Sequence, residues 1–416
     1  MKKIKLTALE RSWILYDIGN SAFILLVSTL IPIYFNALAT TGGLNESLYL
    51  SYWGYAGSVS TLLVAVIGPI CGTLADHRGF KKPIFMVCML LGVLGCAAMG
   101  VTAGWLAFLV VFVLAKVGYS SSLVFYDAML PEVTTDERMD TVSSMGYAYG
   151  YIGSVIPFIL CLLLVLFGDK IGIGAGTAMA VSFLITAVWW FVCTQPLLKR
   201  YRQTAFVEHG GNPVSSTFRR LRDTFREVRQ QKHIFLYLLA FFFFIDGVYT
   251  IIDMATAYGT ALGLDTTGLL LALLVTQIVA FPSALIFGRL SSKYPSTTLI
   301  PVCIAAYAGI AAFAFFLTQQ WQFWVLAVIV GMFQGGVQAL SRSHFAKIIP
   351  PEKSGEYFGL FDICGKGASF LGTMIVSVGS QLTGSANVGV GSIAILFVIG
   401  FVLFSISTRT EETKSV

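Results

Sequence analysis

Ionisable residues interrupt several long apolar stretches of this 416-residue sequence, and two of them share one stretch. Asp246 and Asp253 are seven residues apart. On a helix this spacing places both carboxylates on one face, about 10 Å apart along the axis. If the pair faces a cavity, it could bind an ammonium group or carry a proton. In a structural role, each carboxylate would instead accept a hydrogen bond from a hydroxyl or backbone group of a neighbouring helix. We favour a functional role for Asp246 over one for Asp253, which lies nearer the outer end of the stretch.

A second apolar stretch carries an acid and a base one helical turn apart, Asp362 and Lys366. Residues at this spacing lie on the same helical face, so the pair could neutralise itself and be purely structural. In the functional interpretation, a proton, an ion or a charged substrate competes for one of the two partners. Both interpretations stay open at this point.

Lys116 and Asp127 belong to a third stretch and share a helical face with Ser120. The two charges are separated by about 16 Å along the axis, which is too far for direct pairing. Each therefore needs a partner elsewhere, such as one across a cavity. Asp17 and Asn20 lie near the start of the first stretch, close to a membrane surface, and this position favours Asp17 as a gate residue rather than a central ligand.

Polar side chains also follow one another at helical intervals. Gln334, Gln338 and Arg342 are spaced by four residues, and the amide donors of the two glutamines could orient a polar substrate. Tyr147 and Tyr151 begin a different stretch. Tyrosine at such a position commonly anchors a helix at the membrane surface, and we favour that role for both.

The elements that position these residues are predicted to be membrane-spanning helices. The chain is 56% hydrophobic and 12% charged, whereas soluble domains are about 25% charged. Its apolar runs are long enough to cross a bilayer core of about 30 Å and lack the alternation of barrel strands. We predict an all-α integral membrane protein with twelve transmembrane helices, near 13–38, 50–75, 84–102, 105–129, 142–167, 174–194, 233–262, 268–290, 297–317, 322–345, 355–382 and 388–408.

The distribution of basic residues predicts the orientation. Of 27 lysines and arginines, 24 fall in loops and termini on one side of the predicted spans, whereas only Lys170 falls on the other. The remaining two, Lys116 and Lys366, lie inside spans. Because cytoplasmic loops carry an excess of Lys and Arg, both termini are predicted to be cytoplasmic.

Two pseudo-symmetric six-helix bundles are predicted, residues 1–194 and 233–416, joined by a central cytoplasmic loop at 195–232. Several positions recur at an offset of 219 residues, as a parallel repeat requires. They are Leu130-Pro131 with Ile349-Pro350, Gly146 with Gly365, and Gly153 with Gly372. Within the loop, apolar residues spaced three and four apart among arginines predict either an amphipathic basic helix on the membrane surface or a solvated linker.

After the second predicted span the sequence reads Gly72-Thr-Leu-Ala-Asp76-His77-Arg78-Gly79-Phe80-Lys81-Lys82. This resembles the loop signature of the major facilitator superfamily between helices two and three. Gly72 permits close helix approach and Gly79 permits a tight turn. The resemblance implies that Asp76 helps to latch the two halves on the cytoplasmic side. His77 stands where a basic residue is usual and Arg78 follows it, so the charge network is expected to differ in detail.

Four further stretches narrow the resemblance to the branch of the autophagy-related vacuolar amino-acid effluxer and its bacterial relatives. They are residues 13–23, 125–131, 245–250 and the run from Gly335 through Lys366. The resemblance covers nearly the whole chain. It implies the major facilitator fold, a secondary transporter in a membrane such as the bacterial inner membrane, and amino acids or related zwitterions as the leading substrate class.

We therefore expect alternating access that moves a small polar solute, with a proton or sodium as a possible coupling ion. The candidate substrate or coupling-ion residues are Asp246, Asp253, Asp362, Lys366, Lys116, Gln334 and Gln338. The candidate gate or cytoplasmic latch residues are Asp17, Asn20, Gly72, Asp76, Arg78, Gly79, Asp127 and Arg342. Export of lipids or drugs and a non-transporting receptor or scaffold are the alternatives.

Other function classes are not favoured by the sequence. The four histidines are scattered, the seven cysteines lie inside spans without a C-x-x-C pair, and no metal-ligand cluster or cofactor is expected. No Walker-type phosphate loop is present, which argues against an ATP-driven pump, and we expect no enzyme activity. The basic residues lie in short loops rather than in a nucleic-acid-binding module. The expected partners are a small-molecule substrate and membrane lipids.

Overall fold

The computed structural model describes residues 5–44, 46–208 and 213–415, and the elements found among them are helices. An isolated bridge between His77 and Val207 is the only extended pairing in this part of the chain. The helices of the first half are α1 (Ala8–Ser28), α2 (Leu30–Thr41), α3 (Glu46–Ala75), α4 (Lys81–Ala98), α5 (Trp105–Ala128), α6 (Leu130–Val133), α7 (Asp136–Phe167) and α8 (Ala175–Arg200), with η1 (Met99–Val101) and η2 (Gly168–Ile171) as short 3₁₀ turns.

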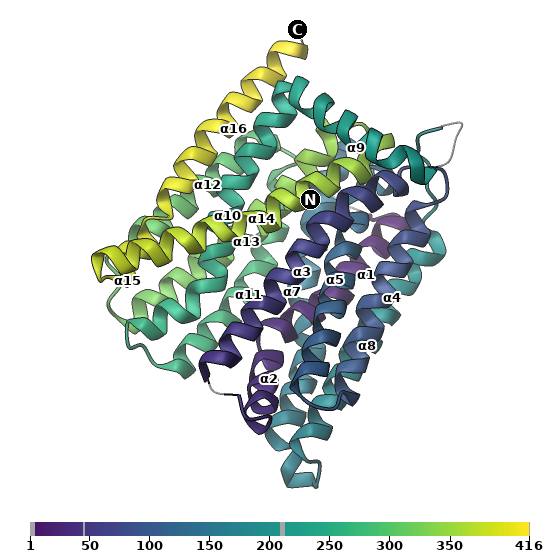
Figure 1. Ribbon diagram of the computed structural model, residues 1–416. Coiled ribbons are helices and arrows are strands. Elements are labelled where there is room, and N and C mark those ends of the chain that lie inside the picture. The colour runs from purple at the N-terminus through teal and green to yellow at the C-terminus, as the bar shows by residue number, and fades with distance from the viewer. Residues whose placement is uncertain (1–4, 45, 209–212, 416) are drawn as a thin grey trace.

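A connecting helix, α9 (Pro213–Gln230), links the halves. The helices of the second half are α10 (Lys232–Ala261), α11 (Thr266–Leu290), α12 (Ser296–Ala314), α13 (Gln320–Ile348), α14 (Ser354–Thr383), α15 (Ala386–Gly391) and α16 (Ala394–Ser415), with η3 (Pro351–Lys353) before α14. Figure 1 shows the first half, coloured purple to blue, beside the second half, coloured green to yellow.

The helices have the length and composition of membrane spans. Within the described residues, ten helices qualify, and α1 with α2, bent by 41° at their junction, adds an eleventh. α14 is a further helix of 30 residues between α13 and α16. The chain is thus an all-helical integral membrane protein, and this arrangement is consistent with the predicted twelve spans.

Each half packs mainly within itself, and a few helices make the contact between halves. In the first half α1 lies against α7 and α8, and in the second α10 lies against α14 and α16. Between halves, α3 packs on α14 and α7 packs on α11 and α13. Because lipid removes the hydrophobic driving force between helices, such interfaces depend on close packing and polar contacts.

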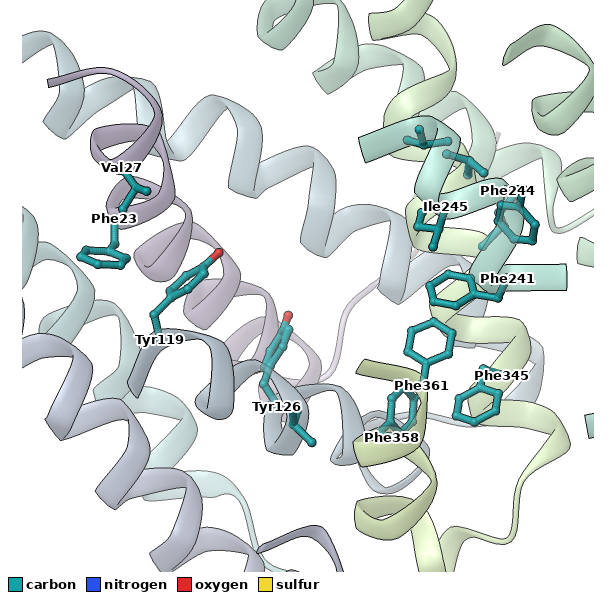
Figure 2. Packing of buried hydrophobic residues seen from close by; sticks show 14 of the residues in the cluster. Phe23, Val27, Tyr119, Tyr126, Phe241, Phe244, Ile245, Phe345, Phe358 and Phe361 are labelled. Carbon is teal, nitrogen blue, oxygen red and sulfur yellow. The ribbon is translucent and has the colours of Figure 1, made fainter. Parts of the chain in front are cut away.

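Aromatic side chains fill the core of both halves. Trp13 stacks on Tyr126 with ring centroids 4.3 Å apart, and Phe241 stacks on Phe361 at 3.9 Å. Figure 2 shows Tyr126 among first-half residues and the Phe241–Phe361 pair in the second half beside Phe345. Both clusters lie next to the boundary between halves, so they support the helices that face it.

The start of α1 and the end of α16 lie at one end of the helix bundle, which we call the terminal end. Near the start of α1, Glu10 forms an ion pair of 2.7 Å with Arg138, at the start of α7. Near the end of α16, Glu411 lies 3.9 Å from His344, in the last turns of α13. Together with the ion pair between Lys347 of α13 and Asp140 of α7, these contacts place the ends of α13 and α16 and the starts of α1 and α7 on the same side.

Candidate functional site

Arg342 of α13 reaches from the second half into the first. Its Nη1 lies 3.0 Å from Oδ1 of Asp127 on α5, and its Nη2 lies 3.5 Å from Oδ2 of Asp17 on α1. Its Nε donates to the hydroxyl of Ser143 on α7 at 3.0 Å. Arg342 is 2% exposed, so the charge of its guanidinium is compensated almost entirely by groups of the opposite half. Asp127 thus has the partner across the boundary that its position required.

Three aromatic rings of the first half surround the same guanidinium. Its carbon lies 4.3 Å from the ring centroid of Tyr147, 4.7 Å from that of Trp13 and 5.5 Å from that of Tyr126. A cation over an aromatic face is attracted by the ring quadrupole, more strongly when water is excluded. Tyr147 therefore packs on Arg342 instead of serving only as the surface anchor that we favoured from its sequence position.

A second ion pair joins the halves closer to the terminal end. Lys347 of α13 lies 2.7 Å from Oδ2 of Asp140 on α7, and the hydroxyl of Ser343 donates to Oδ1 at 2.6 Å. Nearby, the Thr141 hydroxyl donates to the Gly288 carbonyl of α11 at 2.9 Å. Because the partners of each bond belong to different halves, these contacts can persist only while the terminal end is closed.

Asp76 forms the corresponding contact between α3 and α14. Its two carboxylate oxygens accept the backbone N–H groups of Gly355 and Glu356 at 2.8 and 2.9 Å. These amides belong to the first turn of α14, where helical N–H groups lack intrahelical partners and the helix dipole attracts negative charge. Burial raises the pKa of Asp76 to about 7, although the Lys81 ammonium and the two amides act in the opposite direction.

Glycines allow α3 and α14 to approach closely at this contact. A Cβ atom added to Gly72 would collide with the Gly355 carbonyl. A Cβ atom added to Gly359 would lie 2.9 Å from the Cα of Pro69. A larger side chain at either glycine would therefore separate the two helices and the halves to which they belong.

The buried cation of this region is Lys81. Its side chain is fully buried, and Nζ donates to Oε1 of Glu132 at 2.7 Å and to the Ser354 hydroxyl at 2.8 Å. Arg78, for which the sequence suggested a latch role, is exposed, and its guanidinium carbon lies 5.3 Å from the Phe206 ring centroid. The loop signature alone did not separate these two basic residues, because both follow Asp76 within one short loop.

The segment after α8 lies along the terminal end of the first half. The Gln203 amide oxygen accepts the N–H of Gly79 at 2.9 Å, and Gly79 has the positive φ of 79° that its predicted turn role requires. Oε2 of Glu132 accepts the N–H groups of Thr204 and Ala205 at 2.5 and 3.1 Å. These bonds tie residues 201–207 to the first half.

Two described side chains of the connecting helix α9 make polar contacts with the second half. Lys353 of η3 lies 2.6 Å from Oε2 of Glu227, and the Thr224 hydroxyl donates to Glu356. α9 also packs on α3 of the first half, so it covers the closed junction at the terminal end. Figure 1 shows α9 at this end of the molecule.

A small cavity of about 100 Å³ lies at the boundary between halves, beside the Arg342 cluster. The first half contributes Asp127 and Tyr147 to its lining, and the second contributes Tyr249, Gln338 and Asp362. Phenylalanines of α10 and α14 form much of the remaining wall. Three residues that the sequence suggested for separate reasons, Asp127, Gln338 and Asp362, therefore line one cavity.

Other predicted residues lie away from this cavity. Gln334 is buried within α13, and Asn20 donates to the Tyr16 carbonyl of its own helix at 2.9 Å. Lys116 is half-buried, with Nζ 5.9 Å from the Phe112 ring centroid. The side chain of Lys366 lies outside the described residues, as does any pairing of it with Asp362. Among the described residues, no group of three or more His, Cys, Asp or Glu side chains could hold a metal ion.

The two carboxylates of α10 lie in different surroundings. Asp246 is fully buried between α10 and α14, where its Oδ1 accepts the Gly372 N–H at 3.0 Å and the Thr250 hydroxyl at 3.3 Å. Asp253 is exposed, and Lys116 acts on it electrostatically. The two carboxylates lie on the face of α10 that the sequence predicted, but Asp246 is buried between helices whereas Asp253 is exposed.

Comparison with known proteins gives the family. Residues 8–415 match the family model described as vacuole effluxer Atg22 like. An uncharacterized MFS-type transporter of Bacillus subtilis, YxiO, is 40% identical over 99% of this chain and 97% of its own. Autophagy-related protein 22 of Coccidioides immitis is 24% identical over 84% of this chain and 71% of its own.

Solved structures show the same fold at low sequence identity. A variant of the Escherichia coli fucose:proton symporter FucP has a TM-score of 0.72 and 13% identity, with 96% of this chain and 97% of that chain covered. The human organic anion transporter MFSD10 has a TM-score of 0.67 and 14% identity, with 95% and 98% covered. At these identities the likeness concerns the fold alone.

Proposed function

Because this chain belongs to the Atg22-like branch of the major facilitator superfamily transporters, we propose that it moves amino acids or related small zwitterions. The observation that carries this proposal is the cavity between the halves. Two carboxylates, Asp127 and Asp362, and the Gln338 amide line it, and they come from both halves. Carboxylates attract an ammonium group, while an amide can donate to a carboxylate group of the same solute.

Transport would proceed by alternating access of two bundles, residues 1–194 and 233–416, joined by the segment 195–232. The excess of basic residues on the terminal side supports a cytoplasmic location for that end. The bonds of Arg342, Lys347 and Asp76 hold the halves together there. The conformation described is therefore proposed to be closed to the cytoplasm, with the solute reaching the cavity from the opposite side.

In this scheme the three inter-half contacts act as a cytoplasmic gate. Opening requires that Arg342 leaves Asp127 and Asp17, which line or adjoin the cavity. A solute ammonium group bound beside Asp127 would compete with the guanidinium for the same carboxylate. Binding would thereby weaken the gate, which is the coupling between site and conformation that alternating access needs.

Counterflow in proteoliposomes tests the proposal. Purified protein is reconstituted with an excess of each unlabelled amino acid inside, and entry of the labelled form is followed. We expect transient accumulation for at least one amino acid, and its loss in Asp362→Asn. The Asp265→Asn variant is the control, because Asp265 is an exposed N-cap of α11 whose role asparagine can also fill.

Exchange measurements on the same reconstituted protein distinguish amino-acid transport from lipid or drug export and from a receptor or scaffold role. A folded protein that exchanges none of the amino acids but moves labelled lipids or cationic drugs would contradict the amino-acid proposal while retaining transport. A receptor or scaffold would exchange no solute at all, and neutralising Asp246, Asp362 and Lys366 would leave its signalling or assembly intact.

A further inference from the structure

Asp246 is a buried acid beside which no cation lies among the described residues. The residue is fully buried, and hydrogen bonds from the Gly372 backbone and the Thr250 hydroxyl reach only Oδ1. Oδ2 is buried and has no hydrogen-bond partner among the described residues. Both donors are neutral, so they compensate only part of a full negative charge.

The described side chains around Asp246 come from several helices, and none of them is a charged partner of its carboxyl group. α10 packs against α9, α11, α12, α13, α14, α15 and α16. Among the described residues of these helices and of α10 itself, the polar groups that contact the carboxyl are the Gly372 amide and the Thr250 hydroxyl, and none forms an ion pair with it. On the neighbouring turn, Gly247 packs against the Phe397 ring of α16.

A carboxylate ion in such a place is costly. Moving an isolated ion out of water costs several kcal/mol even after relaxation, and a buried carboxyl without a cation is instead neutral. Asp140 shows the contrast within this chain. It is 5% exposed, but Lys347 lies 2.7 Å from its Oδ2, so its charge is compensated. The same residue type at similar burial thus has a cation beside it in one place, whereas in the other the described residues provide none.

We propose that Asp246 holds a proton in this conformation and is the site at which transport is coupled to protons. This inference rests on the proposed transport function. In the proposed coupling scheme, the Asp246 carboxylate takes up one proton when the cavity faces outward. The neutral carboxyl then allows α10 and α14 to remain packed at Gly372. No electron transfer or other bond change is involved.

The position of Asp246 links the proton to the gate. α14 bonds to Asp246 through Gly372 and, at its first turn, to Asp76 through Gly355 and Glu356. When the terminal end opens, α14 loses the Asp76 bonds and shifts relative to α3. A shift of the same helix against α10 opens Asp246 to water, so that the proton leaves on the other side of the membrane.

Infrared spectroscopy of the reconstituted protein tests protonation without any substrate. The C=O stretch of a protonated carboxyl is resolved from the bands of carboxylates. At neutral pH we expect a component of the carboxyl band that is lost in Asp246→Asn and retained in Asp140→Asn, whose carboxylate is ion-paired. An unchanged band in Asp246→Asn, as would follow if Lys366 neutralised Asp246 as an ion, would overturn the proposal.

The Thr250→Val variant provides a second readout if Asp246→Asn does not fold. Loss of a hydrogen bond to the carbonyl oxygen moves a carboxyl band to higher frequency, so we expect an upward shift. A band that does not move would count against Asp246 as its source.

Transport measurements then test coupling. We expect Asp246→Asn to retain amino-acid counterflow but to lose accumulation driven by a proton gradient. Gradient-driven accumulation equal to that of the wild type would overturn the coupling role. If the wild type exchanges no amino acid, the proposed function fails, whereas the infrared result still decides whether Asp246 is protonated.

Discussion

The closed terminal end and the α10–α14 contact compensate buried charge in different ways. At the terminal end, Arg342 and Lys347 of the second half meet Asp17, Asp127 and Asp140 of the first. At the α10–α14 contact, the donors that Asp246 meets among the described residues are neutral and belong to its own half. Charges paired across the boundary depend on how the halves are arranged. A carboxyl without a cation depends on protons instead, so the two regions can respond to different signals.

The largest effect is expected from removing Arg342. Arg342→Ala leaves Asp17 and Asp127 without their cation, and breaking a buried ion pair in this way costs about 3–5 kcal/mol. We expect a large fall in the thermal unfolding temperature of the detergent-purified protein. Arg289→Ala, which removes an exposed arginine of α11, serves as the control. A Tm equal to that of the wild type would show that the cluster contributes little to this conformation.

Replacing Asp362 should weaken solute binding. Hydrogen bonds to charged groups contribute about 1.5–3 kcal/mol, so Asp362→Asn is expected to raise KM about 10- to 100-fold if the solute ammonium group binds there. Initial rates of amino-acid exchange over a range of concentrations measure the change. A fall in kcat at constant KM would instead assign Asp362 to the conformational step.

Adding a methyl group at Gly72 should open the terminal end. Gly72→Ala places Cβ against the Gly355 carbonyl, and overpacking of this kind costs about 1–3 kcal/mol. The ratio of closed to open molecules then falls about 5- to 150-fold. Spin labels at the exposed residues Lys199 and Lys293, one in each half, report the distance between halves in a cysteine-free background.

Gly54→Ala is the matched control for this substitution, because a Cβ atom at Gly54 of the same helix has nothing within 4 Å. Equal distance distributions for the two variants would show that the α3–α14 approach does not hold the terminal end closed.

The smallest effect is expected from the titration of Asp76. Its ordinary pKa is 3.8, and burial in the closed form raises this pKa to about 7. The closed form therefore binds the proton more tightly, and the resulting stabilisation is complete below about pH 4 and is lost as the pH rises through 7. Between pH 6 and 8 the ratio of closed to open molecules should fall about tenfold.

The same spin-label pair measures this titration. Asp76→Asn should remove the fall of the closed-to-open ratio between pH 6 and 8, whereas Asp246→Asn should retain this fall. If the pH response survives in Asp76→Asn and disappears in Asp246→Asn, the proton at the α10–α14 contact alone controls the closed state.

The spans and the family could be predicted from the sequence, because apolar length and the loop motifs are local properties. Helical spacing also indicated which residues share a face, as for Gln338 and Arg342 of α13. It could not indicate which helix lies opposite. The pairing of Arg342 with Asp127 joins residues 215 positions apart and depends on how the halves meet. Asp246 and Asp253 share a face, yet only the neighbouring α14 determines that one is buried and the other exposed.

The segment between the halves also limits how far they can move apart. Its residues 201–207 are bound to the first half through Glu132 and Gly79, whereas Glu227 of α9 pairs with Lys353 of the second half. From Val207 to the start of α9 at Pro213 the chain can span at most about 20 Å when fully extended. As long as α9 keeps its contacts with the second half, the length of this connection limits how far the two halves can separate at the terminal end. A longer connection would permit a wider opening without altering the helices of either half.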